Sequence, residues 1–194
     1  MKQALRITMA LAAGLGLAVS ASATTGGHHE KSRMKSPPPA VGAPAPAFDL
    51  PSSSGGRVSL KSLRGKLVVL YFYPADETPG CTTEACNFRD NQSKLKAQGV
   101  VVLGVSLQNL SSHHQFTKKY KLNFPLLADT SGKVMTAYHC WRDPAKPHTP
   151  MNVDRSTFLI GKDGRILKIW RHVNPTDHAE RVLQAVKALK SAKA

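Results

Sequence analysis

Short continuous apolar runs alternate along the chain with segments whose apolar residues recur at helical spacing. Residues 67–73 read LVVLYFY, seven apolar or aromatic residues in a row. A run of this length, rich in β-branched and aromatic residues, is typical of a strand buried on both faces of a sheet. Residues 100–107 predict a second buried strand, and the Leu126-Leu127 pair predicts a short third one.

Helical segments separate these strands. Residues 82–98 place apolar side chains along one side of a helix that Gly99 would end. Ser111 and Ser112 can cap a second helix, because a side-chain hydroxyl can accept a hydrogen bond from a free N–H group of the first turn. An Asn-Pro pair at 174–175 predicts the start of the last helix.

A hairpin late in the chain completes the pattern. Residues 157–160 and 166–170 flank a Lys-Asp-Gly turn, and residues 57–60 form an earlier short strand after a Gly-Gly turn. Strand, helix, strand and helix, followed by a hairpin and a helix, predict an α/β protein in which helices flank a central mixed sheet. The thioredoxin-like fold has this order of elements.

Length and composition fit one folded domain with extensions. The chain has 194 residues, of which 41% are hydrophobic and 20% charged, so a core can form. Three cysteines are too few for a small disulfide-stabilised domain. The formal charge of +15 permits an anionic partner without naming one. No nucleic-acid-binding motif is visible, and we expect no nucleic-acid partner.

The first residues have the pattern of an export signal. A positive start at Lys2 and Arg6 precedes an uncharged run of 13 residues, 7–19, and an Ala-Ser-Ala site ends at Ala23. The run is shorter than the ~20 residues that span a bilayer, so we expect cleavage near Ala23 and no stable membrane insertion of the mature chain. Residues 1–23 are interpreted as a signal peptide, and the mature protein as periplasmic or secreted.

The next segment differs from the rest of the chain. Residues 24–46 are rich in proline and have no apolar periodicity, which predicts a disordered linker. The single folded domain is therefore expected over residues 47–194. No internal repeat and no second domain are visible.

The segment between the first long strand and the first helix carries the candidate chemistry. Cys81 follows a Pro-Gly turn and lies in the first turn of the predicted helix. Free N–H groups and the positive end of the helix dipole favour a thiolate there, and the thiolate is the reactive form of cysteine. Thr78, three residues earlier, can turn its hydroxyl toward the same place.

A second cysteine, Cys86, follows five residues after Cys81. In an intact helix this spacing separates the two Cα atoms by ~8.7 Å. A disulfide requires about 4.4–6.8 Å, so the pair can close only if the first turns of the helix unwind. If the two thiols form a redox pair, the spacing predicts a conformational change between the reduced and the oxidised form.

The residues around Cys81 resemble a known family. Pro74, Thr78 and Cys81 form the motif P-x-x-x-T-x-x-C. The wider string YFYPADETPGCTTEACNFRD is similar to the peroxiredoxin Q group, also called bacterioferritin comigratory proteins, of the alkyl hydroperoxide reductase and thiol-specific antioxidant family. Similar stretches at residues 42–50 and 155–160 extend the resemblance from about residue 42 to the C-terminus.

The resemblance implies a thiol peroxidase on a thioredoxin fold. Cys81 would be the peroxidatic cysteine, whose thiolate takes an oxygen from hydrogen peroxide or an organic hydroperoxide and becomes a sulfenic acid. Cys86 would be the resolving cysteine, which forms a disulfide with Cys81 that a thioredoxin-like or other dithiol reductant reopens. The resemblance implies no metal, haem or flavin, and a monomer is expected.

Further residues match positions that have roles in the family. Arg155 would favour the thiolate and hydrogen-bond the peroxide oxygens as charge develops on them. Thr78 would position the peroxide, and Pro74 would shield the pocket from water. Glu84 resembles the residue that orients the arginine.

Cys140 departs from the family pattern, because an apolar residue is expected before Trp141. It is interpreted as a small buried hydrophobe, since buried thiols are usually inert. An unpaired thiol in an oxidising compartment could also cross-link to another chain or act as an alternative resolving cysteine. The export signal leaves the reductant open as well, because cytoplasmic thioredoxin could not reach the protein.

Three other interpretations of the cysteines remain open. Cys81 and Cys86 could form a structural disulfide, although their helical separation argues against it. A thiol–disulfide oxidoreductase is a second alternative, which the absence of C-x-x-C disfavours. A copper-binding protein of thioredoxin fold is the third, with Met135, His139 and His148 as candidate additional ligands.

Overall fold

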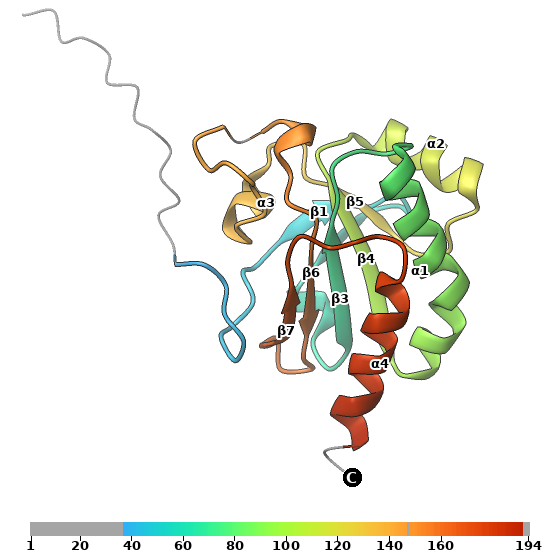
Figure 1. Ribbon diagram of the computed structural model, residues 1–194, viewed down its shortest axis with the longest axis vertical. Helices are drawn as coiled ribbons and strands as arrows, with labels where there is room; N and C mark the ends of the chain where they lie inside the picture. The colour runs from blue at the N-terminus through green and yellow to red at the C-terminus, as the bar shows by residue number, and fades with distance from the viewer. Residues whose placement is uncertain (1–36, 147, 192–194) are drawn as a thin grey trace, which may run out of the picture. The chain divides into compact units, whose positions relative to one another are not determined.

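A five-stranded mixed sheet lies at the centre of the computed structural model, which describes residues 37–146 and 148–191 (Figure 1). Its strand order is β5-β4-β3-β6-β7. The strands are β3 (Leu67–Phe72), β4 (Val100–Ser106), β5 (Leu126–Ala128), β6 (Ser156–Ile160) and β7 (Ile166–Trp170). Strands β4 and β5 run parallel to β3, whereas β6 pairs with β3 and with β7 in antiparallel fashion. The predicted α/β class with a central mixed sheet is confirmed.

Helices cover both faces of this sheet (Figure 1). Helices α1, α2 and α4 pack on one face, and α3 lies on the other together with a small antiparallel hairpin, β1 and β2, and the 3₁₀ turn η1. A second 3₁₀ turn, η2, precedes β6. These elements are β1 (Asp49–Pro51), β2 (Arg57–Ser59), η1 (Lys61–Leu63), α1 (Pro79–Ala97), α2 (Leu110–Tyr120), α3 (Lys133–Ala137), η2 (Pro150–Asn152) and α4 (His178–Ser191).

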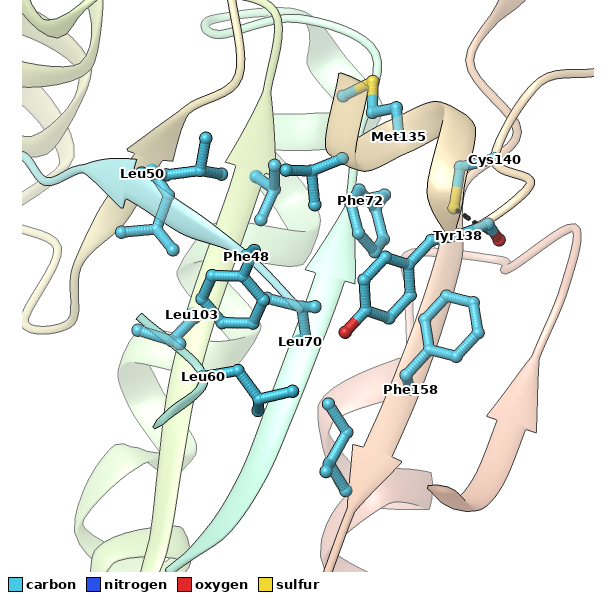
Figure 2. Packing of buried hydrophobic residues seen from close by; sticks show 14 of the residues in the cluster. Phe48, Leu50, Leu60, Leu70, Phe72, Leu103, Met135, Tyr138, Cys140 and Phe158 are labelled. Carbon is cyan, nitrogen blue, oxygen red and sulfur yellow. Dashed lines mark hydrogen bonds between the residues drawn. The ribbon is translucent and has the colours of Figure 1, made fainter. Parts of the chain in front are cut away.

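Strand β3 separates two hydrophobic cores, because its side chains point alternately to opposite faces of the sheet. All six of its residues are buried. Tyr71 belongs to the core under α1, and Phe72 belongs to the core under α3. Figure 2 shows the second core, where the Phe72 ring lies beside those of Tyr138 and Phe158, with centroids 5.0 and 5.8 Å away. The sequence-based prediction of a strand buried on both faces is confirmed.

The helix starts differ from those predicted. Helix α1 begins at Pro79, three residues earlier than expected. Asn109 caps α2 in place of Ser111 and Ser112, because its side-chain oxygen accepts a hydrogen bond from the Ser112 N–H at 3.0 Å. Helix α4 begins at His178, and the Asn-Pro pair that was expected to open it lies in the preceding loop.

The folded domain begins before the predicted boundary at residue 47. The Gly42 N–H donates to the Ile166 carbonyl at 2.8 Å, and the Ile166 N–H donates to the Ala43 carbonyl at 2.9 Å. Residues 42–46 therefore belong to the domain and not to a disordered linker. The physical reason is that the edge strand β7 offers open backbone groups, which the non-proline residues of this segment can still pair with.

The proposed signal peptide, residues 1–23, lies outside the described residues, as does the linker up to residue 36. None of the helices between residues 37 and 191 combines the length and the apolar character that a membrane crossing requires.

Candidate active site

Cys81 is the third residue of α1, just after the loop that leaves the central strand β3. Its side chain is buried, with 1% of its surface exposed. The helical hydrogen bonds begin at Thr82, whose N–H donates to the Thr78 carbonyl at 2.8 Å. The Gly80 and Cys81 N–H groups therefore precede the helical ladder, at the positive end of the helix dipole. This placement of Cys81 at a helix start is as the sequence predicted.

Arg155 brings a full positive charge to the same sulfur. Its Nη2 atom donates to Cys81 Sγ at 3.2 Å. The two residues meet because β6 runs antiparallel to β3 and pairs Ser156 with Phe72, which places residue 155 beside the loop in front of α1. The strand pairing thus delivers a guanidinium to the helix start that carries the thiol.

Glu84 holds the other side of this guanidinium. Arg155 Nη1 donates to Glu84 Oε2 at 2.5 Å, and the Glu84 side chain is fully buried. Burial raises the pKa of Glu84 to about 7, and the charge and hydrogen bond of Arg155 act in the opposite direction. Burial also opposes the charged form of Arg155, but the charges of Glu84 and Cys81 outweigh it and raise the pKa of Arg155. The three side chains therefore form one hydrogen-bonded chain, with Arg155 between Cys81 and Glu84.

The other two motif residues lie at the rim of the site. Thr78 is exposed and is the N-cap residue of α1, and its hydroxyl donates to the Ala75 carbonyl at 3.1 Å. No hydrogen bond joins Thr78 to Cys81 within residues 37–146 and 148–191, and the hydroxyl that could turn toward the thiol is instead bonded within its own turn. The nearby carbonyl is the reason, because it offers a local acceptor within the turn. Pro74 is half-buried in the loop that follows β3.

Cys86 lies five residues further along the same intact helix and is half-buried. Cys81, Cys86 and Cys140 are all free thiols. The structure therefore has the helical form that the spacing predicts for the reduced protein, and Cys81 and Cys86 do not form a structural disulfide in it. Arg89 follows one turn later, where Asp90 and, to a smaller extent, the Cys86 sulfur raise the pKa of its guanidinium.

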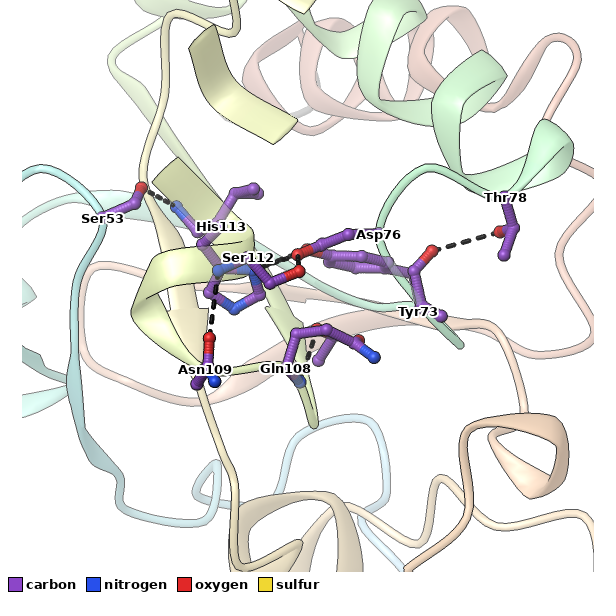
Figure 3. Close-up of polar contacts among 11 residues, drawn as sticks. Ser53, Tyr73, Asp76, Thr78, Gln108, Asn109, Ser112 and His113 are labelled. Carbon is purple, nitrogen blue, oxygen red and sulfur yellow. Dashed lines mark hydrogen bonds and ion pairs between the residues drawn. The ribbon is translucent and has the colours of Figure 1, made fainter. Parts of the chain in front are cut away.

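The loop in front of α1 is anchored by Asp76, which the sequence analysis missed. Its carboxylate accepts hydrogen bonds from the Tyr73 and Ser112 hydroxyls, both at 2.6 Å, and pairs with His113 Nδ1 at 2.9 Å (Figure 3). Burial raises the pKa of Asp76, but the contacts with His113 and the hydroxyls outweigh it and lower the pKa below its ordinary value. An acidic residue in a short loop between two prolines was the only sequence signal.

Cys140 lies on the other face of the sheet from Cys81, in the core under α3 (Figure 2). Its side chain is fully buried. Burial raises the pKa of Cys140 to about 12, against the opposing effect of the nearby Arg171. The interpretation as a small buried hydrophobe is confirmed, and burial disfavours cross-linking to another chain.

The candidate copper ligands are not brought together. In the part of the chain that the structure describes, no group of three or more His, Cys, Asp or Glu side chains could hold a metal ion. Met135 is buried in the core under α3, across the sheet from Cys81. His148 packs against Trp141, with ring centroids 5.5 Å apart. The copper-binding alternative therefore has no structural support.

Comparison with known proteins agrees with the geometry around Cys81. The sequence profile of the AhpC/TSA family matches residues 41–169. The chain belongs to this family. Peroxiredoxin Bcp of Bacillus subtilis is 42% identical to it over 150 residues, which cover 76% of this chain and 94% of that protein. The chloroplastic peroxiredoxin Q of Sedum lineare is 40% identical over 150 residues, covering 77% and 78% of the two chains.

Solved structures of similar proteins have the same fold. PrxQ of Xylella fastidiosa matches with a TM-score of 0.73 at 31% identity, over 80% of this chain and 99% of that one. The bacterioferritin comigratory protein of Xanthomonas campestris matches with a TM-score of 0.67 at 34% identity, over 73% and 90%. The protein is a peroxiredoxin of the Bcp and Q type on a thioredoxin fold, and it is a thiol peroxidase.

Proposed function

We propose that the protein is an exported peroxiredoxin in which Cys81 attacks hydroperoxides and Cys86 resolves the product. The observation that carries the proposal is the 3.2 Å contact from Arg155 Nη2 to Cys81 Sγ, at a sulfur that lies in the first turn of a helix. A guanidinium and the positive end of a helix dipole both favour the thiolate, which is the nucleophile.

In the first step the Cys81 thiolate attacks one oxygen of the hydroperoxide. A sulfur–oxygen bond forms, the oxygen–oxygen bond breaks, and the leaving oxygen takes a proton to become water or an alcohol. Arg155 stabilises the negative charge that develops on that oxygen, and Glu84 keeps the guanidinium in place. The Thr78 hydroxyl, at the rim, would turn from the Ala75 carbonyl to the bound peroxide.

In the second step the Cys86 sulfur attacks the sulfur of the Cys81 sulfenic acid. A disulfide forms and the hydroxyl leaves with a proton as water. Because ~8.7 Å separates two helical Cα atoms at this spacing, the first turns of α1 unwind before the bond can close. A dithiol reductant, for which a thioredoxin-like protein is our proposal, then restores both thiols by two exchange reactions and is itself oxidised to a disulfide.

Hydrogen peroxide and organic hydroperoxides are the proposed substrates. The Xanthomonas campestris protein is described for its alkyl peroxide reduction activity, which supports the organic class. Pro74 is proposed to limit water at the site, and no metal, haem or flavin has a place in these steps. Export is supported by the pattern of residues 1–23, and the mature chain is proposed to act as a monomer.

Peroxide consumption by Cys81→Ser tests the proposed reaction. With a thioredoxin system as reductant, we expect this variant to lose peroxidase activity while its circular dichroism spectrum stays native. The control Cys140→Ser should retain turnover. Unchanged turnover in Cys81→Ser would overturn the assignment.

Fractionation of cells tests export separately. We expect the full chain in the periplasm or medium with a new N-terminus near Thr24, and a chain without residues 2–23 in the cytoplasm. An uncleaved full chain in the cytoplasm would contradict the proposed location but would not affect the assignment as a peroxidase.

A further inference from the structure

The two neighbours of Arg155 in sequence are held on the face of the sheet opposite to Cys81. Arg155 points to Cys81, whereas the Ser156 hydroxyl donates to Asp154 Oδ2 at 3.0 Å on the other side. Ser156 is fully buried and Asp154 nearly so. Side chains alternate along an extended chain, which places these two residues on the face opposite to Arg155. Because they are its direct neighbours in the chain, any movement of them also moves the Arg155 backbone.

Arg171, the residue that follows β7, contacts several groups on this second face. Its Nη2 atom donates to the Tyr138 carbonyl at 3.0 Å, and its Nη1 atom donates to the His139 carbonyl at 2.9 Å. Tyr138 is the C-cap residue of α3 and His139 follows it, so the guanidinium lies at the C-terminal end of this helix, where a positive charge interacts favourably with the helix dipole. Its guanidinium also lies 4.9 Å from the centroid of the Phe158 ring in β6.

The same guanidinium also contacts the start of β6. Arg171 Nη1 donates to Ser156 Oγ at 3.2 Å and to Cys140 Sγ at 3.6 Å. Cys140 is the small side chain that fits beside it, and Figure 2 shows its sulfur turned toward the Tyr138 carbonyl, 3.6 Å away. The unexpected cysteine of the sequence thus lines the site of Arg171.

Backbone contacts fix the same stretch from both sides. The Asp154 N–H donates to the Cys140 carbonyl at 2.8 Å, and the Val173 N–H donates to the Arg155 carbonyl at 3.0 Å. His172, next to Arg171, pairs through Nδ1 with Asp154 Oδ1 at 2.8 Å. The segment after β7 therefore holds all of residues 154–156.

We propose that Arg171 is a positioning residue of the peroxidatic site, which holds the start of β6 so that Arg155 meets Cys81. The inference rests on the proposed roles of Cys81 and Arg155. Charged hydrogen bonds weaken steeply with distance and angle, so a displacement of about 1 Å at the strand start is enough to weaken the contact between guanidinium and sulfur. Arg171 itself touches no reacting atom.

Substitution of Arg171 by glutamine tests this role, with Lys168→Gln as the matched control. Lys168 is exposed on β7, three residues before Arg171, and its loss removes the same charge. The readout is the pH dependence of alkylation at Cys81 in the fully reduced protein, located by peptide mass. We expect Arg171→Gln to shift the midpoint upward by about one pH unit and Lys168→Gln to leave it unchanged.

A double-substitution cycle separates positioning from a general effect on the fold. If Arg171 acts through Arg155, Arg171→Gln should add no further shift in an Arg155→Gln background. An equal shift in both backgrounds, or no shift in the single variant, would overturn the inference. Should Arg171→Gln fail to fold, Arg171→Lys supports the same cycle, because it keeps the charge but cannot span the carbonyl and hydroxyl partners.

The two proposals fail in different ways. Alkylation of Cys81 requires neither peroxide nor turnover with a reductant. Its pH dependence therefore tests the role of Arg171 independently of the peroxidase reaction. If reduced wild-type protein is alkylated at Cys81 but does not consume hydroperoxides, the proposed function is wrong. The shift of the alkylation midpoint in Arg171→Gln would still test the positioning role.

Discussion

Arg155 Nη2 and Cys81 Sγ lie 3.2 Å apart although the two residues are 74 positions apart in the sequence. The antiparallel pairing of β6 with β3 creates this contact, since it sets Ser156 opposite Phe72 at the end of the central strand. Helix α1 starts seven residues after that strand ends and supplies the thiol. A guanidinium and a helix N-terminus therefore converge on one buried sulfur.

Removal of the guanidinium should weaken the thiolate. Arg155→Ala takes away the positive charge at Cys81, and loss of such a partner shifts a titration by about 1–3 pH units. We expect the midpoint of Cys81 reactivity to rise. Peroxide attack should slow by roughly tenfold to a hundredfold, because the leaving oxygen loses the positive charge that stabilises it. Stopped-flow rates across pH measure this, with the exposed Arg181→Gln as control. A profile identical to the wild type would contradict the role of Arg155.

Loss of the second thiol should stop turnover after one cycle. Cys86→Ser leaves Cys81 and Arg155 in place, so the variant should still consume about one peroxide per chain. It should then accumulate as the sulfenic acid or more oxidised forms and fail to recycle with dithiol reductants. Sustained cycling at the wild-type rate would show that another thiol resolves the intermediate. Cys140→Ser, measured alongside, is expected to cycle normally.

Glu84 should act through the orientation of Arg155. In Glu84→Gln the carboxylate that accepts the hydrogen bond from Arg155 Nη1 becomes a neutral amide. We expect peroxide attack to slow by about tenfold, which corresponds to a rise of ~1.4 kcal/mol in the activation free energy when Arg155 is less well aligned. The variant should fold, because burial already disfavours the charged form. Rapid-mixing kinetics at pH 7.5 check the rate. An unchanged rate would mean that Arg155 is held by its backbone alone.

His178 should make the fold sensitive to acid. The side chain is fully buried, with Nε2 2.8 Å from Thr157 Oγ1, and burial lowers the pKa of His178 to about 4. The unfolded chain takes up a proton near pH 6.5, whereas the folded protein resists it until about pH 4. The stabilising contribution of His178 is therefore present above pH 6.5 and is lost as the pH falls toward 4.

Urea unfolding between pH 7 and pH 4 measures this effect. We expect the free energy of unfolding to decrease over that range more steeply in the wild type than in His178→Gln, by on the order of 3 kcal/mol. Parallel pH profiles of the two proteins would show that His178 does not titrate differently in the folded and unfolded states.

The parts of the site that depend on local sequence could be predicted. The seven-residue apolar run predicted β3, and the Pro-Gly turn before Cys81 placed the thiol at a helix start. The helix starts were harder to predict, because several neighbouring residues can each begin a helix. Asn109 caps α2 although Ser111 and Ser112 are also capping residues, and α4 begins at His178 although an Asn-Pro pair precedes it. The sequence allowed Thr78 to turn its hydroxyl toward the thiol, whereas in the structure the hydroxyl donates to the Ala75 carbonyl of its own turn.

Contacts between distant segments could not be predicted from periodicity. Asp76 reads as an ordinary loop acid until α2 places Ser112 and His113 beside it. Arg171 reads as a basic residue at a strand end until α3 turns two carbonyls toward it. Arg155 was identified only through resemblance to a family, since no spacing in the chain links it to Cys81.

The most direct test of the account is the fate of the sulfur atoms after a single oxidation. Fully reduced protein is treated with one equivalent of hydrogen peroxide, quenched with an alkylating reagent and mapped by peptide mass. We predict that Cys81 and Cys86 are found joined in one disulfide while Cys140 stays a thiol. Peroxide left unconsumed, with Cys81 recovered in its alkylated form, would contradict the account.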